Sequence, residues 1–226
     1  MLEYCVTLTS SQAIDKLQES IRTMVQATHN QSIALDSLRE GQPVVFPTDT
    51  LYGMGVSVRD AQSHEVLYQI KRREKRKPVA WLVSGIDDLT TYGKCVPELA
   101  QALARTFWPG PLTIIVRASD AVPEQFRSPE GTIGMRMPSN PEALAMIEAL
   151  GCPIATTSAN FSGVKPPRAF SDIDPELAAQ ISVLLEDDDM ANPKSGIAST
   201  IVDCTTGHAV MKRVGAITIE DIKALS

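Results

Sequence analysis

Short apolar runs alternate along this chain with amphipathic helical patterns, and this alternation limits the fold more than any other feature. Runs with strand character occupy residues 44–46, 79–83, 113–116, 132–136, 154–156, 183–185 and 200–202. Helical periodicity occupies residues 10–29, 32–40, 63–71, 97–107 and 141–150, and Thr218 with Asp221 opens a final helix. Helices interleaved with many strands indicate an α/β fold with a twisted, open, mixed sheet flanked by helices.

The chain has 226 residues, of which 43% are hydrophobic, so it is long enough to bury one large core. We expect one compact domain over residues 32–226, preceded by a helical N-terminal extension over residues 1–31. The polar stretches near 119–130 and 186–195 are predicted to be loops. The acidic run at 186–189 is predicted to be solvated within one of them.

The sequence argues against several classes of protein. The first ten residues lack the basic start and long apolar stretch of a signal peptide, and no window approaches the roughly 20 apolar residues that span a bilayer. We therefore expect a cytoplasmic protein without membrane contact. The four cysteines form no CxxC pair and the three histidines form no HExxH motif, so no metal-ligand set is predicted.

Residues 71–77, with the sequence KRREKRK, place six basic side chains and one acidic one in a chain whose net charge is −6. Such a dense local cluster suits a small phosphate-bearing ligand or a short contact with RNA better than wrapped duplex DNA. A solvated helix end is the alternative reading of the same run. In either case we expect these basic side chains to be exposed.

The common nucleotide motifs are missing, since the chain has neither GxxxxGK[ST] nor GxGxxG. Three other segments combine small or hydroxylated residues with the end or start of a predicted strand. They are residues 47–53 (PTDTLYG), 157–163 (TSANFSG) and 199–200. Ligands gather at strand ends in α/β folds, so these segments are candidate binding loops.

Seven motifs in order, PTDTLYG, KRREKRKP, WPGPLT, TIGMRMP, TSANFSG, IASTIVD and KRVG, resemble the Sua5/YrdC/YciO/YwlC family from about Ser32 onward. The resemblance implies a single YrdC-like domain with a basic concave surface. It also implies a nucleotidyltransferase that makes L-threonylcarbamoyladenylate and pyrophosphate from L-threonine, bicarbonate and ATP with Mg²⁺. Threonylcarbamoyl transferase machinery would then use the product for the t6A37 modification of tRNA.

The resemblance also assigns roles to individual residues. Lys71 and Arg73 match the family's KxR pair, which implies phosphate binding and catalysis. Arg136 matches the arginine that pairs with the threonine carboxylate, an anion that a guanidinium fork suits. The other implied threonine contacts are Thr50, Thr156 and Ser199. The other implied nucleotide contacts are Lys77, Thr132, Ser158, Asn160 and Arg213.

One position departs from the family pattern, because Leu82 stands where many synthases carry a histidine in the threonine site. Two alternatives to a synthase therefore stay open. One is a YciO-like paralogue with little synthase activity. The other is a module that binds tRNA or double-stranded RNA through its basic surface, although aromatic residues are only 5% of the chain and do not interleave with the basic run.

Overall fold

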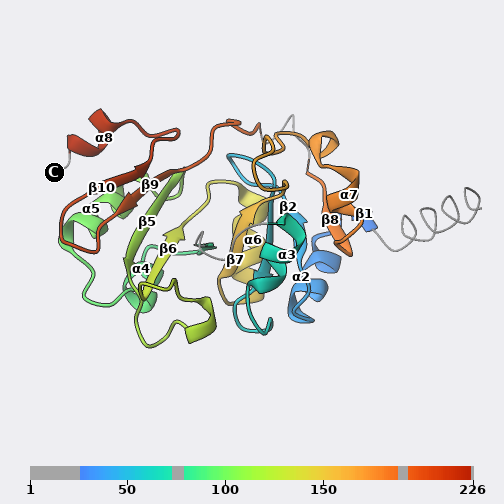
Figure 1. Cartoon of the computed structure of the whole chain (residues 1–226), viewed down its shortest axis with the longest axis horizontal. Helices are drawn as coiled ribbons and strands as arrows, with labels where there is room; N and C mark the ends of the chain where they lie inside the picture. The colour runs from blue at the N-terminus through green and yellow to red at the C-terminus, as the bar shows by residue number, and fades with distance from the viewer. Residues whose placement is uncertain (1–25, 73–78, 188–192, 225–226) are drawn as a thin grey trace, which may run out of the picture.

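The structure is a computed structural model that describes residues 26–72, 79–187 and 193–224. The described chain forms a ten-stranded mixed sheet with helices on its faces (Figure 1). In chain order the strands are β1 (Gln26–Thr28), β2 (Val44–Phe46), β3 (Gly53–Ser57), β4 (Ala80–Leu82), β5 (Leu112–Arg117), β6 (Thr132–Arg136), β7 (Ile154–Ser158), β8 (Val183–Leu185), β9 (Thr200–Asp203) and β10 (Val210–Arg213). Across the sheet their order is β1-β8-β2-β3-β7-β4-β6-β5-β9-β10.

The helices are short and mostly well capped. They are α2 (Gln31–Arg39), α3 (Glu65–Lys71), α4 (Asp88–Tyr92), α5 (Glu98–Phe107), α6 (Pro141–Leu150), α7 (Pro175–Ala178) and α8 (Ile219–Lys223). The Asn140 side chain caps α6 by accepting from the Ala143 amide, and Gly151 ends the helix at φ +70°. A left-handed residue at this position is the common glycine helix stop.

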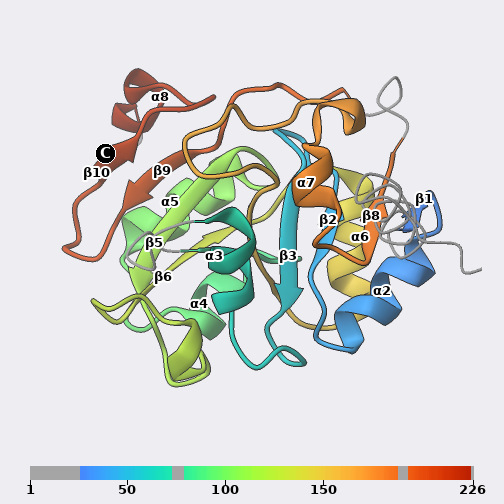
Figure 2. The same cartoon turned by 45° about the vertical axis from the view of Figure 1, so that its right-hand side comes forward.

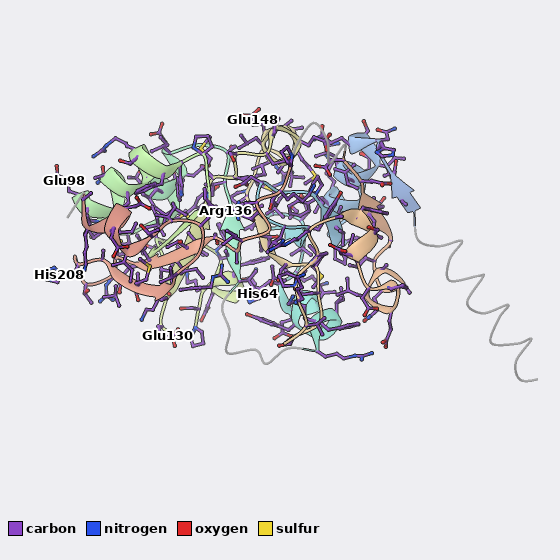
Figure 3. The ribbon with its side chains drawn as sticks, turned by 90° about the horizontal axis from the view of Figure 1, so that it is seen from above. His64, Glu98, Glu130, Arg136, Glu148 and His208 are labelled. Carbon is purple, nitrogen blue, oxygen red and sulfur yellow. The ribbon has the colours of Figure 1, made fainter. Side chains whose placement is uncertain are left out.

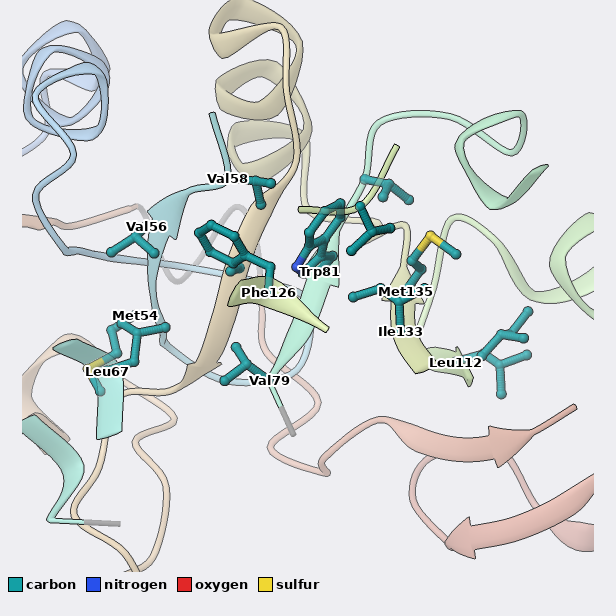
Figure 4. Close-up of a cluster of buried hydrophobic side chains, with 14 of the residues drawn as sticks. Met54, Val56, Val58, Leu67, Val79, Trp81, Leu112, Phe126, Ile133 and Met135 are labelled. Atoms are coloured by element: carbon teal, nitrogen blue, oxygen red, sulfur yellow. The ribbon is translucent and has the colours of Figure 1, made fainter. Parts of the chain in front are cut away.

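Alternation along the strands divides the apolar side chains between the two faces of the sheet. Val44 and Phe46 of β2 pack in one cluster with α2 and α6, while Val45 between them packs in the other cluster. Trp81 and Met135, which pair across β4 and β6, belong to the larger cluster drawn in Figure 4. Side chains in a strand alternate with period two, so the residues on either side of Trp81 face the opposite surface.

The register of the central strands sets up a row of side chains on that opposite surface. Leu82 of β4 pairs with Arg136 of β6 in the parallel ladder. On the other side of β6, Met135 pairs with Ile114 of β5, which brings Thr113 opposite Arg136. Figure 2 places β9, β10 and α8 at one end of the molecule and α2 with β1 at the other. The row of Leu82, Arg136 and Thr113 therefore lies in the middle of the sheet.

The fold matches the predicted α/β class with a mixed sheet. The predicted helix at 141–150 has its observed bounds, and Thr218 and Asp221 form the capping box that begins α8. Residues 26–31, which the sequence assigned to the helical extension, contain strand β1 at 26–28 and the first residue of α2, so the described end of the helix predicted at 10–29 is a strand, which pairs with β8. Most of the helix predicted at 10–29 lies outside the described residues.

Asp187 corrects the expectation that the acidic run is solvated. Its side chain is 0% exposed and pairs with Lys194, whose side chain is 1% exposed. Burial of this carboxylate depends on a partner seven residues along the chain, which local charge patterning does not reveal. The neighbouring residues 188 and 189 lie outside the described part of the chain.

Within the described ranges, every helix is too short or too polar to cross a lipid bilayer.

Candidate functional site

A cavity of about 280 Å³ opens beside the central strands, and its walls come from segments far apart in the sequence. The turn before β3, the strands β4, β5, β6 and β7, and the region around β9 and β10 all contribute. Its polar lining residues are Thr48, Thr50, Tyr52, Thr113, Arg136, Thr156, Thr157, Ser158, Asn160, Ser199 and Arg213.

Arg136 is the buried charge of this cavity, at the end of β6 and near the middle of the molecule in Figure 3. Its Nε donates to the Gly110 carbonyl at 3.1 Å, and one Nη donates to the Thr50 hydroxyl at 2.9 Å. The other Nη donates to the Asp49 carboxylate at 2.5 Å. Burial lowers the pKa of the guanidinium and Asp49 opposes that effect. Arginine keeps its charge in proteins, so the result is an oriented cation on the wall.

The turn that carries Thr50 is fixed by Thr48. The Thr48 hydroxyl donates to the Leu51 carbonyl at 2.6 Å and lies 3.1 Å from the Thr50 hydroxyl. Thr48 therefore stabilises the turn, whereas Thr50 presents its hydroxyl to Arg136 and the cavity. A hydroxyl can both donate and accept, so Thr50 is suited to a polar group on a ligand.

Lys71, the last residue of α3, reaches the turn that follows β7. Its Nζ donates to the carbonyl oxygens of Ser158 and Asn160 at 2.5 and 2.6 Å, and to the Asn160 side-chain oxygen at 3.1 Å. The residue is only 3% exposed, which corrects the expectation that the basic run is solvent-exposed at this position. Lys71 thus holds in place two residues that line the cavity, Ser158 and Asn160.

A chain of polar side chains forms the wall nearest β9. Arg213 donates from Nε to the Ser199 carbonyl at 2.9 Å and from Nη2 to the Ser199 hydroxyl at 3.0 Å. That hydroxyl lies 2.9 Å from the Thr113 hydroxyl. Both hydroxyl residues are buried. Arg213 therefore brings a second positive charge to the cavity rim.

The lining is cationic on an acidic protein. Among the described residues that line the cavity there are two arginines and no Asp or Glu, although the whole chain carries a net charge of −6. Positive groups in a partly closed cleft concentrate anions. The cavity is therefore suited to a ligand with carboxylate or phosphate groups.

Seven of the predicted site residues line this one cavity: Thr50, Arg136, Thr156, Ser199, Ser158, Asn160 and Arg213. Leu82 lines it as well. Thr132 lies instead in a neighbouring cavity of about 490 Å³ and its hydroxyl is 2.8 Å from that of Ser128. Arg73 and Lys77 lie outside the described residues.

The other described member of the basic run, Arg72, is occupied within the protein. It pairs with Glu176, and its guanidinium carbon lies 4.6 Å from the centre of the Phe161 ring. Sequence patterning could not reveal this contact, because Glu176 is more than a hundred residues away along the chain.

Three residues outside the set of predicted contacts also shape the cavity. Asp49 orients Arg136, Thr113 joins the Ser199 chain, and Tyr52 lines the wall while its hydroxyl bonds to Asp187. Asp49 and Tyr52 lie in the PTDTLYG segment and Thr113 closes WPGPLT, so the signal was present in the motifs. Their partners are distant in sequence, and for that reason their roles needed the structure.

Comparisons with known proteins identify the family of this chain. The family model Sua5/YciO/YrdC, described as Telomere recombination, matches residues 36–215. A threonylcarbamoyl-AMP synthase of Pyrococcus abyssi is 33% identical over 84% of this chain and 55% of its own length. One of Bacillus subtilis is 34% identical over 83% of this chain and 54% of its own length.

Solved structures give the same result. The Sua5 protein of P. abyssi in complex with L-threonine superposes with a TM-score of 0.80 at 32% identity, over 86% of this chain and 56% of that one. Escherichia coli YciO superposes with a TM-score of 0.77 at 26% identity, over 88% of this chain and 100% of that one. The chain spans about half the length of the two synthases it matches above. On this evidence the chain belongs to the Sua5/YciO/YrdC family.

Proposed function

We propose that this protein is an L-threonylcarbamoyladenylate synthase that uses L-threonine, bicarbonate and ATP. The observation that carries the proposal is that one cationic cavity is lined by seven residues, four of which the family resemblance assigns to L-threonine and three to the nucleotide. Family membership, together with synthases among the relatives, supports the same choice.

In the proposed reaction, the threonine amine and bicarbonate give a carbamate and water. A carbamate oxygen then attacks the α-phosphorus of ATP, and the bond from that phosphorus to the bridging oxygen breaks. Pyrophosphate leaves, and the product is a mixed anhydride of carbamate and AMP. All of the reactants are anionic in part, so the chief task of the protein is to bring negative groups together in a fixed geometry.

The residues divide this task between two sides of the cavity. Arg136 and Thr50 would hold the amino-acid carboxylate and hydroxyl, because their donors are already oriented by Asp49 and Thr48. On the other side, Ser158 and Asn160 would contact phosphate through the turn that Lys71 fixes. Arg213 supplies positive charge near the ribose and phosphates.

Mg²⁺ would enter with the triphosphate. The described lining residues offer hydroxyl, amide and carbonyl oxygens but no carboxylate, and these suit a hydrated ion that phosphates already coordinate. Such an ion would supply positive charge opposite the pyrophosphate leaving group. We further propose that the product serves the t6A modification of tRNA through a separate transferase.

The test is a turnover assay with purified protein, ATP, Mg²⁺ and bicarbonate, with and without L-threonine. Pyrophosphate release that needs threonine, together with the adenylate product by mass spectrometry, is the expected result. Folded protein that binds ATP yet releases no pyrophosphate would contradict the proposal.

A YciO-like protein without efficient turnover is the second candidate, and one observation favours it. Leu82 places an apolar side chain in the cavity, directly beside Arg136 in the β ladder. If the wild type is inactive, Leu82→His is the first variant to assay. RNA binding by the basic segment is tested separately, as salt-dependent affinity that threonine does not change.

A further inference from the structure

A buried ion pair outside the cavity lies directly behind its wall. The Lys194 ammonium is 2.8 Å from Oδ1 of Asp187, and their side chains are 1% and 0% exposed. The Tyr52 hydroxyl donates to the same Oδ1 at 2.7 Å. The ammonium also lies 4.4 Å from the centre of the Tyr52 ring. These three side chains form one closed unit, which we call the Lys194 clamp.

Stability alone is a poor reason for such a unit. Removing two charges from water costs several kcal/mol per ion, and their attraction often does no more than offset that cost. The Lys194 ammonium and the Tyr52 hydroxyl both bind Oδ1 of Asp187, whereas Oδ2 has no hydrogen-bond partner among the described residues. The best-attested role of such buried pairs is to select one conformation of the chain around them.

The arrangement selected here reaches the cavity through the backbone. The two residues after Lys194 donate their amides to the turn before β3: Ser195 to the Asp49 carbonyl and Gly196 to the Thr50 carbonyl, each at 2.9 Å. Asp49 and Thr50 are the residues whose side chains orient Arg136. Lys194 is thus joined to Arg136 by two short links, one backbone and one side-chain.

We propose that Lys194 and Asp187 are positioning residues for the amino-acid side of the cavity. Their ion pair, closed on Tyr52, holds residues 195–196 against the turn and thereby sets the direction of the Arg136 guanidinium. The inference rests on the proposed function, in that Arg136 receives the carboxylate of L-threonine. The Lys71 ammonium fixes the turn at 158–160 through Ser158 and Asn160, so we expect the loss of Lys194 to affect the nucleotide side much less than the amino-acid side. The Ala159 amide of that turn also donates to the Tyr52 carbonyl, a backbone bond that a change at Lys194 leaves in place.

The experiment compares L-threonine and ATP affinity by calorimetry in the wild type, Lys194→Met and a matched control, Lys94→Met. Methionine keeps the length of the lysine stem and removes the charge, and Lys94 is an exposed lysine far from the clamp in sequence. We expect Lys194→Met to raise the threonine Kd roughly tenfold or more, because small errors of orientation are costly. The ATP Kd should stay within about twofold, and the control should match the wild type.

A double variant separates positioning from stability. Lys194→Met leaves a buried carboxylate unpaired and is expected to lower Tm, whereas Lys194→Met with Asp187→Asn removes both charges and should recover part of that loss. The threonine Kd of the double variant should nevertheless stay high, because the ammonium that holds the turn is still missing. Recovery of both quantities together would overturn the proposal and leave a structural role only.

Other outcomes are also decisive. Folded Lys194→Met with an unchanged threonine Kd, or with equal losses for threonine and ATP, would overturn the positioning role. If Lys194→Met does not fold, Tyr52→Phe removes one bond of the clamp and keeps the ring, and an unchanged threonine to ATP affinity ratio in that variant would also overturn it. Failure of the wild type to bind threonine at all would instead count against the proposed function.

Discussion

The Asp49 carboxylate lies 2.5 Å from the Arg136 guanidinium, and the two side chains are 15% and 8% exposed. Arg136 also donates to Gly110 and Thr50, so its guanidinium plane is held by three acceptors from two segments. A buried guanidinium fixed in this way binds an anion through the orientation of its N–H groups as well as through its charge. The first prediction separates these two properties.

Replacing Arg136 by lysine keeps the positive charge and removes the planar fork. Loss of one charge-assisted hydrogen bond costs about 2 kcal/mol, which corresponds to roughly 30-fold weaker L-threonine binding. Calorimetric titration of Arg136→Lys measures this effect. Arg59→Lys, which alters the ion pair between the exposed Arg59 and the partly buried Asp60, is the control. Equal affinity in the wild type and Arg136→Lys would show that charge alone is sufficient.

Lys71→Met is expected to damage stability as well as activity. The ammonium is buried and donates to two backbone carbonyls, which the variant leaves without this partner. We expect a loss of about 3 kcal/mol in the free energy of unfolding, measured by urea denaturation. The exposed Lys94→Met should change it by less than about 0.5 kcal/mol. A stable but inactive Lys71→Met would mean that the lysine serves the ligand and not the turn.

Gly215→Ala is expected to disturb the Ser199 wall of the cavity. A Cβ at Gly215 would lie 2.1 Å from the Ala198 carbonyl oxygen and 2.6 Å from the Ser199 carbonyl carbon, and both are backbone atoms. Overpacking of this kind costs about 1 to 3 kcal/mol, which a shift in thermal unfolding would detect. Gly85→Ala, where the nearest atom is 3.9 Å away, is the control and should change little.

His64 gives the protein a pH dependence on the acid side. Burial lowers the pKa of its imidazole below the ordinary value of 6.5. The unfolded chain therefore takes up a proton before the folded one does, so stability is full above about pH 6.5 and falls as the pH decreases toward the folded pKa. His64→Phe keeps the ring packing against Tyr68 and Phe126 but does not titrate. Its unfolding free energy should fall less between pH 7 and pH 5; equal slopes would rule out His64 as the cause.

The parts of the fold that were predictable are those with a local cause. Asn140 and Gly151 cap α6 from within its own sequence, and the apolar run of β2 is buried throughout. β3 escaped prediction because Gly53 and Gly55 weaken its strand signal. Their lack of a side chain has a tertiary reason, since a Cβ at Gly55 would lie 2.5 Å from the Ile154 side chain of the next strand.

The site divides in the same way. Motif order was enough to gather Thr50, Arg136 and Ser199, which the structure brings to one cavity. The burial of Lys71 was mispredicted because its acceptors at Ser158 and Asn160 come from a distant part of the chain. Basic residues are mostly exposed in folded proteins, so the sequence alone predicts an exposed Lys71. Its burial becomes apparent only from its tertiary contacts.

The walls of the cavity come from both early and late parts of the described chain. During synthesis, Thr50 and Arg136 emerge long before Ser199 and Arg213, and they have no opposite wall until β9 pairs with β5 and β10 pairs with β9. The nascent protein should therefore be unable to retain its substrates until nearly all of its sheet has formed. Once the cavity is complete, ligand binding stabilises the whole folded state against unfolding. Ligand-induced protection can thus serve as a sensor for chains that have finished folding.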